Sequence, residues 1–335
     1  VLALPFLLGR TRVRVDLVLE PRRVVAGESV AASVEVTNVA PRRLVPTTLE
    51  LPVGASTHRY AVPSLAPGAG HVETFTIRTE RRGVIAVGPA TTRRGDPLSV
   101  YSRDVAWTDV AEVLVRPPMV PLDSLGAGLL RDLEGVSTDA VSQSDLAFHA
   151  LREYTPGDDL RHVHWRSSAK ADQLLVRQYL DTRRSHATIV VDDAPSSWAD
   201  GEDFETAMSV AASIAIRAVL DDFETTVVCG EHASSGADGT RALDAICRAE
   251  LSGRGLVAGG QHAARIAPDT SLLFLLSGRG TAYDAFRRAA AIFPLEARRF
   301  AMIVDAAEKP RVTEAGGLPV LHLADKGDLA ALLHW

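Results

Sequence analysis

Hydrophobic and polar residues alternate with a period of two along the first third of the chain. Such alternation is typical of strands that bury one face, and turn residues such as Ala66-Pro67-Gly68 separate the runs. Several short strands at this spacing predict a β-sandwich over residues 13–118. The alternating runs are residues 13–19, 30–37, 44–51, 72–79, 84–87 and 112–116.

The pattern changes from residue 187 onward, where short apolar runs alternate with amphipathic segments. Ala187–Val191 is continuously apolar, as expected of a parallel strand that is covered on both faces. Asp203 is a candidate cap for a helix that runs to about residue 221. Alternating strands and helices predict a doubly wound α/β domain over residues 187–335. Further strands are expected at 225–229, 272–276, 300–304 and 319–323, helices at 241–251, 283–292 and from 325, and a turn at Gly259-Gly260.

Prolines separate these two regions. Pro117, Pro118 and Pro121 break the strand pattern, because proline has no backbone N–H to donate to a sheet. Residues 119–186 are therefore expected to connect the domains.

Composition narrows the function classes. The 335 residues suffice for two domains, and 46% hydrophobic and 23% charged residues are typical of a globular protein. The net charge of −6 gives no general case for a nucleic-acid partner. Cys229 and Cys247 are too few for a structural zinc site and do not form a disulfide framework.

The first twelve residues indicate a membrane anchor. Val1–Leu8 is apolar but far shorter than the roughly 20 residues that span a bilayer. Arg10, Arg12 and Arg14 follow, and basic residues beside a membrane segment favour the cytoplasmic side. We therefore expect residues 1–12 to be the end of a membrane-anchoring segment, with the domains at the cell membrane on its cytoplasmic side. The alternative is that the apolar run Val1–Leu8 is a short buried strand.

A dense polar run at residues 151–177 carries the most specific motif. It resembles the signature of the bacterial "domain of unknown function fifty-eight" proteins, which are often encoded beside MoxR-type AAA+ ATPases. The resemblance continues in Arg81-Arg82-Gly83 and in Gly95-Asp96-Pro97, but Leu98-Ser99 stands where the family has Phe-Gly. The signature residues are Arg152, Glu153, Tyr154, Gly157, Asp158, Asp159, Arg161, Trp165 and Arg177.

The resemblance implies an architecture more than an activity. It implies a membrane hairpin, a β-rich segment and a von Willebrand factor A-like domain, with no settled biochemistry. Residues 20–38 resemble bacterial immunoglobulin-like modules, so the predicted β-sandwich is expected to be immunoglobulin-like. A protein-interaction or assembly module that acts with a MoxR-type ATPase, without catalysis of its own, is the function expected. The charged signature residues suit either a clamp that ties this segment to the α/β domain or a docking surface for a partner.

Two groups of residues are candidates for a metal. In von Willebrand factor A-like domains a D-x-S-x-S loop after the first strand binds a divalent cation, and here Asp192, Ser196 and Ser277 are the corresponding oxygen donors. Ala194 replaces the first serine of that pattern, so either no cofactor or a weakly held Mg²⁺ is expected.

The second group contains two histidines. His162 and His164, spaced i and i+2 on a predicted strand, would point to one face. Asp158 or Asp159 could add a third ligand. A metal-dependent hydrolase that uses His162, His164, Asp158 and Asp192 is thus the alternative function.

Overall fold

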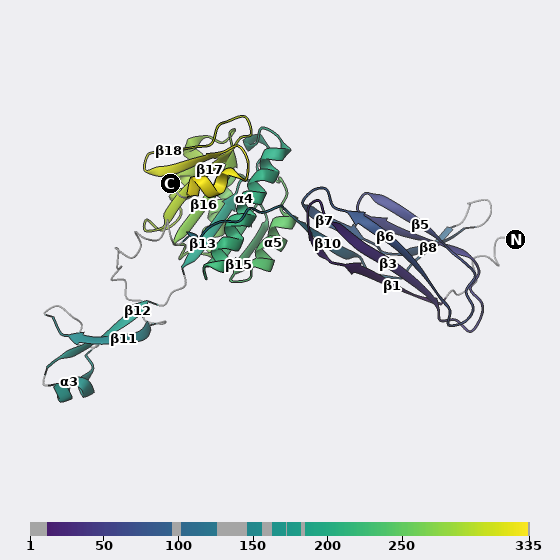
Figure 1. Ribbon diagram of the computed structural model, residues 1–335, viewed down its shortest axis with the longest axis horizontal. Helices are drawn as coiled ribbons and strands as arrows, with labels where there is room; N and C mark the ends of the chain where they lie inside the picture. The colour runs from purple at the N-terminus through teal and green to yellow at the C-terminus, as the bar shows by residue number, and fades with distance from the viewer. Residues whose placement is uncertain are drawn as a thin grey trace.

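The computed structural model describes residues 12–95, 102–125, 146–155, 163–171, 173–181 and 185–333. Figure 1 shows a β-sandwich, an α/β domain beside it, and a small arm that projects from the far side of the α/β domain. No helix in these ranges is long and apolar enough to cross a membrane.

The sandwich packs a small sheet against a larger one. The smaller sheet is antiparallel, in the order β1 (Val13–Glu20), β3 (Ser29–Asn38) and β6 (Gly70–Arg78). The strands of the larger sheet follow the order β2 (Arg23–Val25), β10 (Ala111–Arg116), β7 (Gly83–Val87), β4 (Thr47–Val53), β8 (Thr91–Gly95) and β9 (Ser102–Ala106), with β5 (Ser56–Val62) paired to β4.

Alternation along the strands builds the core of the sandwich. Val30, Ala32, Val34 and Val36 on β3 are 0–4% exposed, whereas the residues that alternate with them face outward or are half-buried. Leu49 and Leu51 of β4 meet them from the other sheet in one continuous apolar cluster. Each strand therefore contributes one apolar face to a shared interior.

The α/β domain is built on a seven-stranded mixed sheet in the order β15-β14-β13-β16-β17-β19-β18. Its five central strands are parallel, and both edge strands are antiparallel to their neighbours. The strands are β13 (His186–Val191), β14 (Glu224–Cys229), β15 (His232–Gly236), β16 (Leu272–Gly278), β17 (Arg298–Val304), β18 (Arg311–Ala315) and β19 (Leu318–Leu323).

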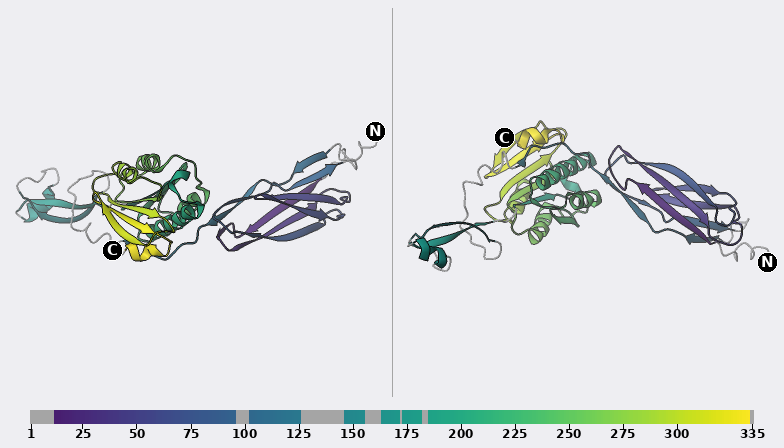
Figure 2. Two further views of the ribbon diagram at one scale, coloured as in Figure 1. Left: turned by 90° about the horizontal axis from the view of Figure 1, so that it is seen from above. Right: turned by 60° about the horizontal axis from the view of Figure 1, so that its bottom comes forward.

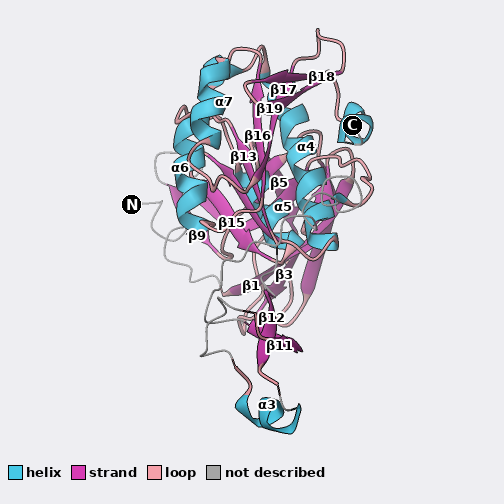
Figure 3. Ribbon diagram, turned by 90° about the vertical axis from the view of Figure 1, so that its left-hand side faces the viewer, coloured by secondary structure: helices cyan, strands magenta, loops and turns pink. Residues whose placement is uncertain are grey.

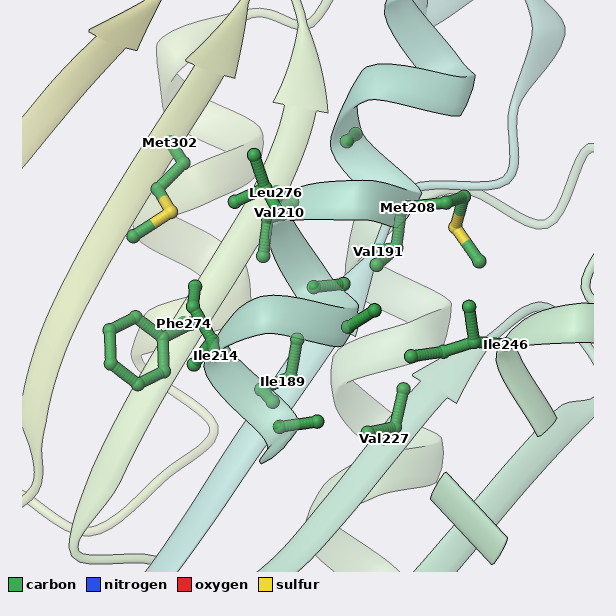
Figure 4. Close-up of a cluster of buried hydrophobic side chains, with 14 of the residues drawn as sticks. Ile189, Val191, Met208, Val210, Ile214, Val227, Ile246, Phe274, Leu276 and Met302 are labelled. Atoms are coloured by element: carbon green, nitrogen blue, oxygen red, sulfur yellow. The ribbon is translucent and has the colours of Figure 1, made fainter. Parts of the chain in front are cut away.

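Helices cover both faces of this sheet, as Figure 3 shows. One face packs against α4 (Gly201–Leu220), α5 (Gly239–Arg248) and α8 (Asp328–Leu333), and the other against α6 (Leu256–Ile266) and α7 (Tyr283–Ala290). Figure 4 shows the first of these cores, where Met208 and Ile214 of α4 lie over Ile189, Phe274 and Leu276 of the sheet. Coverage on both faces explains why the central strands read as continuous apolar runs.

Two local predictions in this domain are wrong. Gly259-Gly260 lies inside α6 rather than in a turn, because a Cβ at Gly259 would meet Val190 Cγ1 at 3.0 Å and only a small residue lets the helix lie this close to β13. The cap of α4 is Asp200, not Asp203, since its carboxylate accepts from the N–H groups of Glu202 and Asp203 at 2.9 and 3.0 Å.

Arg82 joins the two domains. Its guanidinium, 5% exposed, forms two hydrogen bonds with Glu205 of α4 at 2.8 and 3.0 Å. It also donates to the carbonyl oxygens of Ile246 and Ala249 at the end of α5, both at 2.7 Å, and lies over the Phe204 ring. A single sandwich side chain thus donates to carbonyl oxygens at the C-terminal end of α5, where a helix lacks part of its own donors.

Other ion pairs surround this contact. Arg23 makes two hydrogen bonds to Asp244 at 2.7 and 3.0 Å, and Arg248 pairs with Glu112. These pairs are more exposed than Arg82, so they contribute less to the joint.

Candidate functional site

A buried carboxylate organises the carboxyl edge of the parallel sheet. Asp192 directly follows β13 and is 2% exposed. Its Oδ2 accepts hydrogen bonds from the hydroxyls of Ser197 (2.8 Å), Ser277 (2.7 Å) and Thr281 (3.1 Å), and its Oδ1 accepts from the N–H of Ala194 at 2.9 Å. Asp192 therefore ties the loops that follow β13 and β16 together.

Close backbone packing makes this cluster possible. A Cβ at Gly278 would lie 2.3 Å from the carbonyl oxygen of Ser197, and one at Gly280 would lie 2.3 Å from that of Ser196. The N–H of Gly280 donates to the Ser197 carbonyl at 2.9 Å. The two glycines let the loop after β16 lie against the loop after β13, which brings Ser277 and Thr281 to Asp192.

The membership of the cluster differs from the sequence prediction. Asp192 and Ser277 lie together, but the Ser196 side chain is exposed and Ser197 occupies its expected place. Thr281 was not predicted at all. The Gly278-x-Gly280-Thr281 spacing was the available signal, because paired glycines mark a close backbone approach.

Asp193 faces a different loop. Its Oδ1 accepts from the N–H of Gly255 at 2.7 Å, and its Oδ2 accepts from the hydroxyl of Ser252 and from the N–H of Arg254. Its carbonyl oxygen accepts from the N–H groups of Ser252 and Gly253, both at 3.0 Å. Asp193 is 1% exposed, and it therefore fixes the segment that leads into α6. The carboxylates of Asp192 and Asp193 bind different loops and have no hydrogen-bond donor in common.

A shallow cleft of about 270 Å³ opens beside Asp192, with Arg254, Leu256 and Thr281 among its lining residues. It lies at the carboxyl ends of parallel strands, where open α/β sheets bind ligands. Carboxylate and hydroxyl oxygens are donors that suit Mg²⁺. Here, however, three hydroxyls donate to Asp192 itself, and Asp193 is engaged elsewhere.

The cluster therefore forms a closed hydrogen-bond network, in which the hydroxyl oxygens of Ser277 and Thr281 also lie 2.6 Å apart. A cation would bind here only if these hydroxyls turned their protons away from Asp192 and coordinated it through their lone pairs. Across the part of the chain that the structure describes, no group of three or more His, Cys, Asp and Glu side chains is placed to hold a metal.

The signature segment forms the projecting arm, which comprises β11 (Leu146–Glu153), α3 (Trp165–Ala171) and β12 (Leu175–Asp181). β11 and β12 pair antiparallel, and Figure 2 shows the arm outside both domains. Arg152 and Glu153 lie on β11, Tyr154 follows it, Trp165 begins α3 and Arg177 lies on β12. The predicted signature residues Gly157, Asp158, Asp159 and Arg161, and also His162, lie outside the described residues.

His164 is not on a strand, contrary to the prediction. Val163 forms an isolated bridge with Val176, and His164 then immediately precedes α3. Its Nδ1 accepts from the N–H of Ser167 at 3.1 Å, so the ring serves the first turn of the helix. Figure 1 places α3 at the far end of the arm, so the structure does not bring His164 to Asp192.

The arm buries little and exposes an aromatic ring. Val163 and Val176 are 3% and 5% exposed, but Trp165 is 63% exposed and Leu174 is 40% exposed. The charged side chains of α3 are basic, including Lys170 in its last turn. Trp165, Arg166 and Lys170 thus give α3 a small basic and aromatic surface, in a chain whose net charge is −6.

The fold defines a two-domain protein in which a β-sandwich precedes an α/β domain with a mixed sheet. Residues 150–234 match the model of the family described as "Protein of unknown function DUF58", and this match supports a DUF58 family protein. The matched stretch contains most of the arm and the loop of Asp192 and Asp193. No curated protein matches the sequence.

Solved structures resemble about a third of the chain. The CARDB domain of the PF1109 protein from Pyrococcus furiosus is 18% identical, with 32% of this chain and 93% of that chain covered and a TM-score of 0.24. The putative ApaA protein from Bordetella pertussis is 14% identical, with 31% and 92% covered and a TM-score of 0.23. A β-glucosidase from Listeria innocua is 16% identical, with 32% and 16% covered and a TM-score of 0.21. At these values the likenesses bear on no activity.

Proposed function

We propose that this protein is a membrane-anchored interaction module that docks a partner through its projecting arm and has no catalysis of its own. The observation that carries the proposal is Trp165, which is 63% exposed on an arm that lies outside both domains. Tryptophan is the residue type most enriched among the side chains that dominate binding energy at interfaces.

The physical state of the arm supports a docking role over a clamp. A two-stranded hairpin is marginally stable by itself in water, and α3 is the only helix that accompanies it among the residues that the structure describes. A partner that buries Trp165 and Leu174 would supply the missing apolar contacts. Because Lys170 and its neighbour Arg166 are exposed, the complementary surface would be acidic.

The resemblance to MoxR-associated proteins supports a MoxR-type AAA+ ATPase as this partner. In the same proposal the α/β domain is of the von Willebrand factor A-like type, which is supported by the Asp192 loop at the carboxyl edge of its sheet. Anchoring at the membrane, with the domains on the cytoplasmic side, is supported by the apolar run Val1–Leu8 and the arginines that follow it.

The test measures binding of a MoxR-type ATPase from the same genome to the purified protein by isothermal titration. Trp165→Ala is expected to weaken the complex about tenfold or more, as truncation of a central aromatic anchor does. Leu220→Ala is the matched control, because Leu220 is also apolar and 66% exposed but lies at the end of α4. Equal affinity of the Trp165 variant and the parent would refute docking through the arm, and no binding by the parent would refute the ATPase as partner.

A further inference from the structure

A cavity of about 380 Å³ lies near the C-terminal helix, and it shares no lining residue with the cleft beside Asp192. It opens between the start of β17, the β18–β19 hairpin and α8, the yellow helix beside the C label in Figure 1. Because β17 begins here, the cavity sits at the amino end of the parallel strands, whereas the Asp192 cleft sits at their carboxyl end. Its volume falls within the range of about 300–1,000 Å³ that is usual for small-molecule sites.

Apolar side chains form most of the cavity wall. Leu321 is 2% exposed at the base, whereas Val312, Leu332 and Leu333 pack against the core but stay only partly buried. Leu295 stands at the rim and is 88% exposed. This wall would bind an apolar chain by removing further surface from water.

Two arginines line the cavity. Arg298 and Arg299 both line it, and none of the described lining residues is acidic. The Nη2 of Arg299 donates to the Pro294 carbonyl at 2.6 Å, which fixes the orientation of the guanidinium. Because the guanidinium of Arg299 lines the cavity, an anionic oxygen bound there would gain a charge-assisted hydrogen bond from it.

We propose that this cavity is a binding site for a small carboxylate that carries an apolar chain. The carboxylate contacts Arg299, and the chain lies along Leu321, Leu332 and Leu333. The site is independent of the arm, so it stands or falls separately from the proposed docking function.

The experiment titrates the whole protein with hexanoate, octanoate, decanoate and decanol, and follows binding by calorimetry. Each added methylene is expected to tighten binding by up to about fourfold, which corresponds to roughly 0.8 kcal/mol per buried methylene. Decanol, which has the same chain without the charge, is expected to bind about tenfold more weakly than decanoate. Absence of saturable decanoate binding, or equal binding of decanol and decanoate, would overturn the proposal.

A variant pair locates the site. Arg299→Gln is expected to weaken decanoate binding about tenfold or more, because it removes the charged donor. Arg287→Gln is the matched control, since Arg287 lies on α7 with a 68% exposed side chain and does not line the cavity. Unchanged affinity in the Arg299 variant would place the ligand elsewhere and overturn the assignment. If that variant does not fold, as judged by circular dichroism, the chain-length series and decanol on the parent protein still decide.

Discussion

Replacing Arg82 by alanine is expected to destabilise the protein more than any other single change at the domain joint. The variant removes the two hydrogen bonds to Glu205 and the two that Arg82 donates to the carbonyl oxygens of Ile246 and Ala249. Loss of one partner of a buried ion pair costs about 3–5 kcal/mol. Glu205 is 29% exposed and can recover part of its hydration, so we expect the free energy of unfolding to fall by about 2–3 kcal/mol.

The neighbouring arginine is the control for this measurement. Arg81 pairs with Glu202 at 2.6 Å, but the two side chains are 75% and 70% exposed. Arg81→Ala is therefore expected to change the free energy of unfolding by less than about 1 kcal/mol. Arg82→Lys should fall between the two, because lysine keeps the charge but lacks the planar fork that reaches Glu205 and the carbonyls together.

Urea unfolding followed by circular dichroism measures these differences. Because the chain has two domains, the Arg82 variant is also expected to separate one transition into two, as the coupling across the joint weakens. If Arg82→Ala and Arg81→Ala shift the midpoint equally, the inference that Arg82 couples the domains is refuted.

Two further predictions concern the α/β domain. Gly278→Ala is expected to lower the free energy of unfolding by about 2–3 kcal/mol, because the new Cβ would lie 2.3 Å from the Ser197 carbonyl oxygen. Gly201→Ala is the control: open space surrounds Gly201, so this variant should be neutral or stabilising in the same urea titration. Equal effects of the two variants would contradict the close approach of the two loops. Burial raises the pKa of the Cys229 thiol from its ordinary value of 9.0 to about 12 and that of Cys247 to about 11, so both should react with a thiol reagent at pH 8 only after unfolding. Because these pKa values are higher in the folded state than in the unfolded state, the thiols' contribution to stability is complete below pH 9 and is lost as the pH rises toward 12. Rapid labelling of the native protein by the thiol reagent would contradict the burial of the two cysteines.

The periodicity of hydrophobic residues was the main basis for predicting individual strands and helices. The predicted strand at 272–276 lies within β16, and the alternating run at 30–37 lies within β3. These assignments succeed because a strand records in its own sequence whether one face or both faces are buried. The α6 helix was missed for the converse reason: its paired glycines lower helix propensity locally, and only the packing of Gly259 on β13 explains them.

The candidate site was only partly visible in the sequence. Asp192 was identifiable because a carboxylate after a buried parallel strand must lie at the carboxyl edge of the sheet. The choice of Ser197 over Ser196, and the presence of Thr281, follow from how the two loops pack against each other. A difference of one residue depends on how closely the backbones of the two loops approach each other, and the sequence of either loop alone does not indicate that distance.

The sequence by itself therefore determined the alternating strands, the apolar strands of the α/β domain, the resemblance of its signature, and the positions of the charged motifs. Only the tertiary structure decided what those motifs contact. Arg82 binds residues more than a hundred positions later, and Trp165 is exposed because the arm lies outside both domains. The physical reason is that periodicity reports which face of a segment is buried, whereas the partner of a side chain is set by chain segments that are distant in sequence.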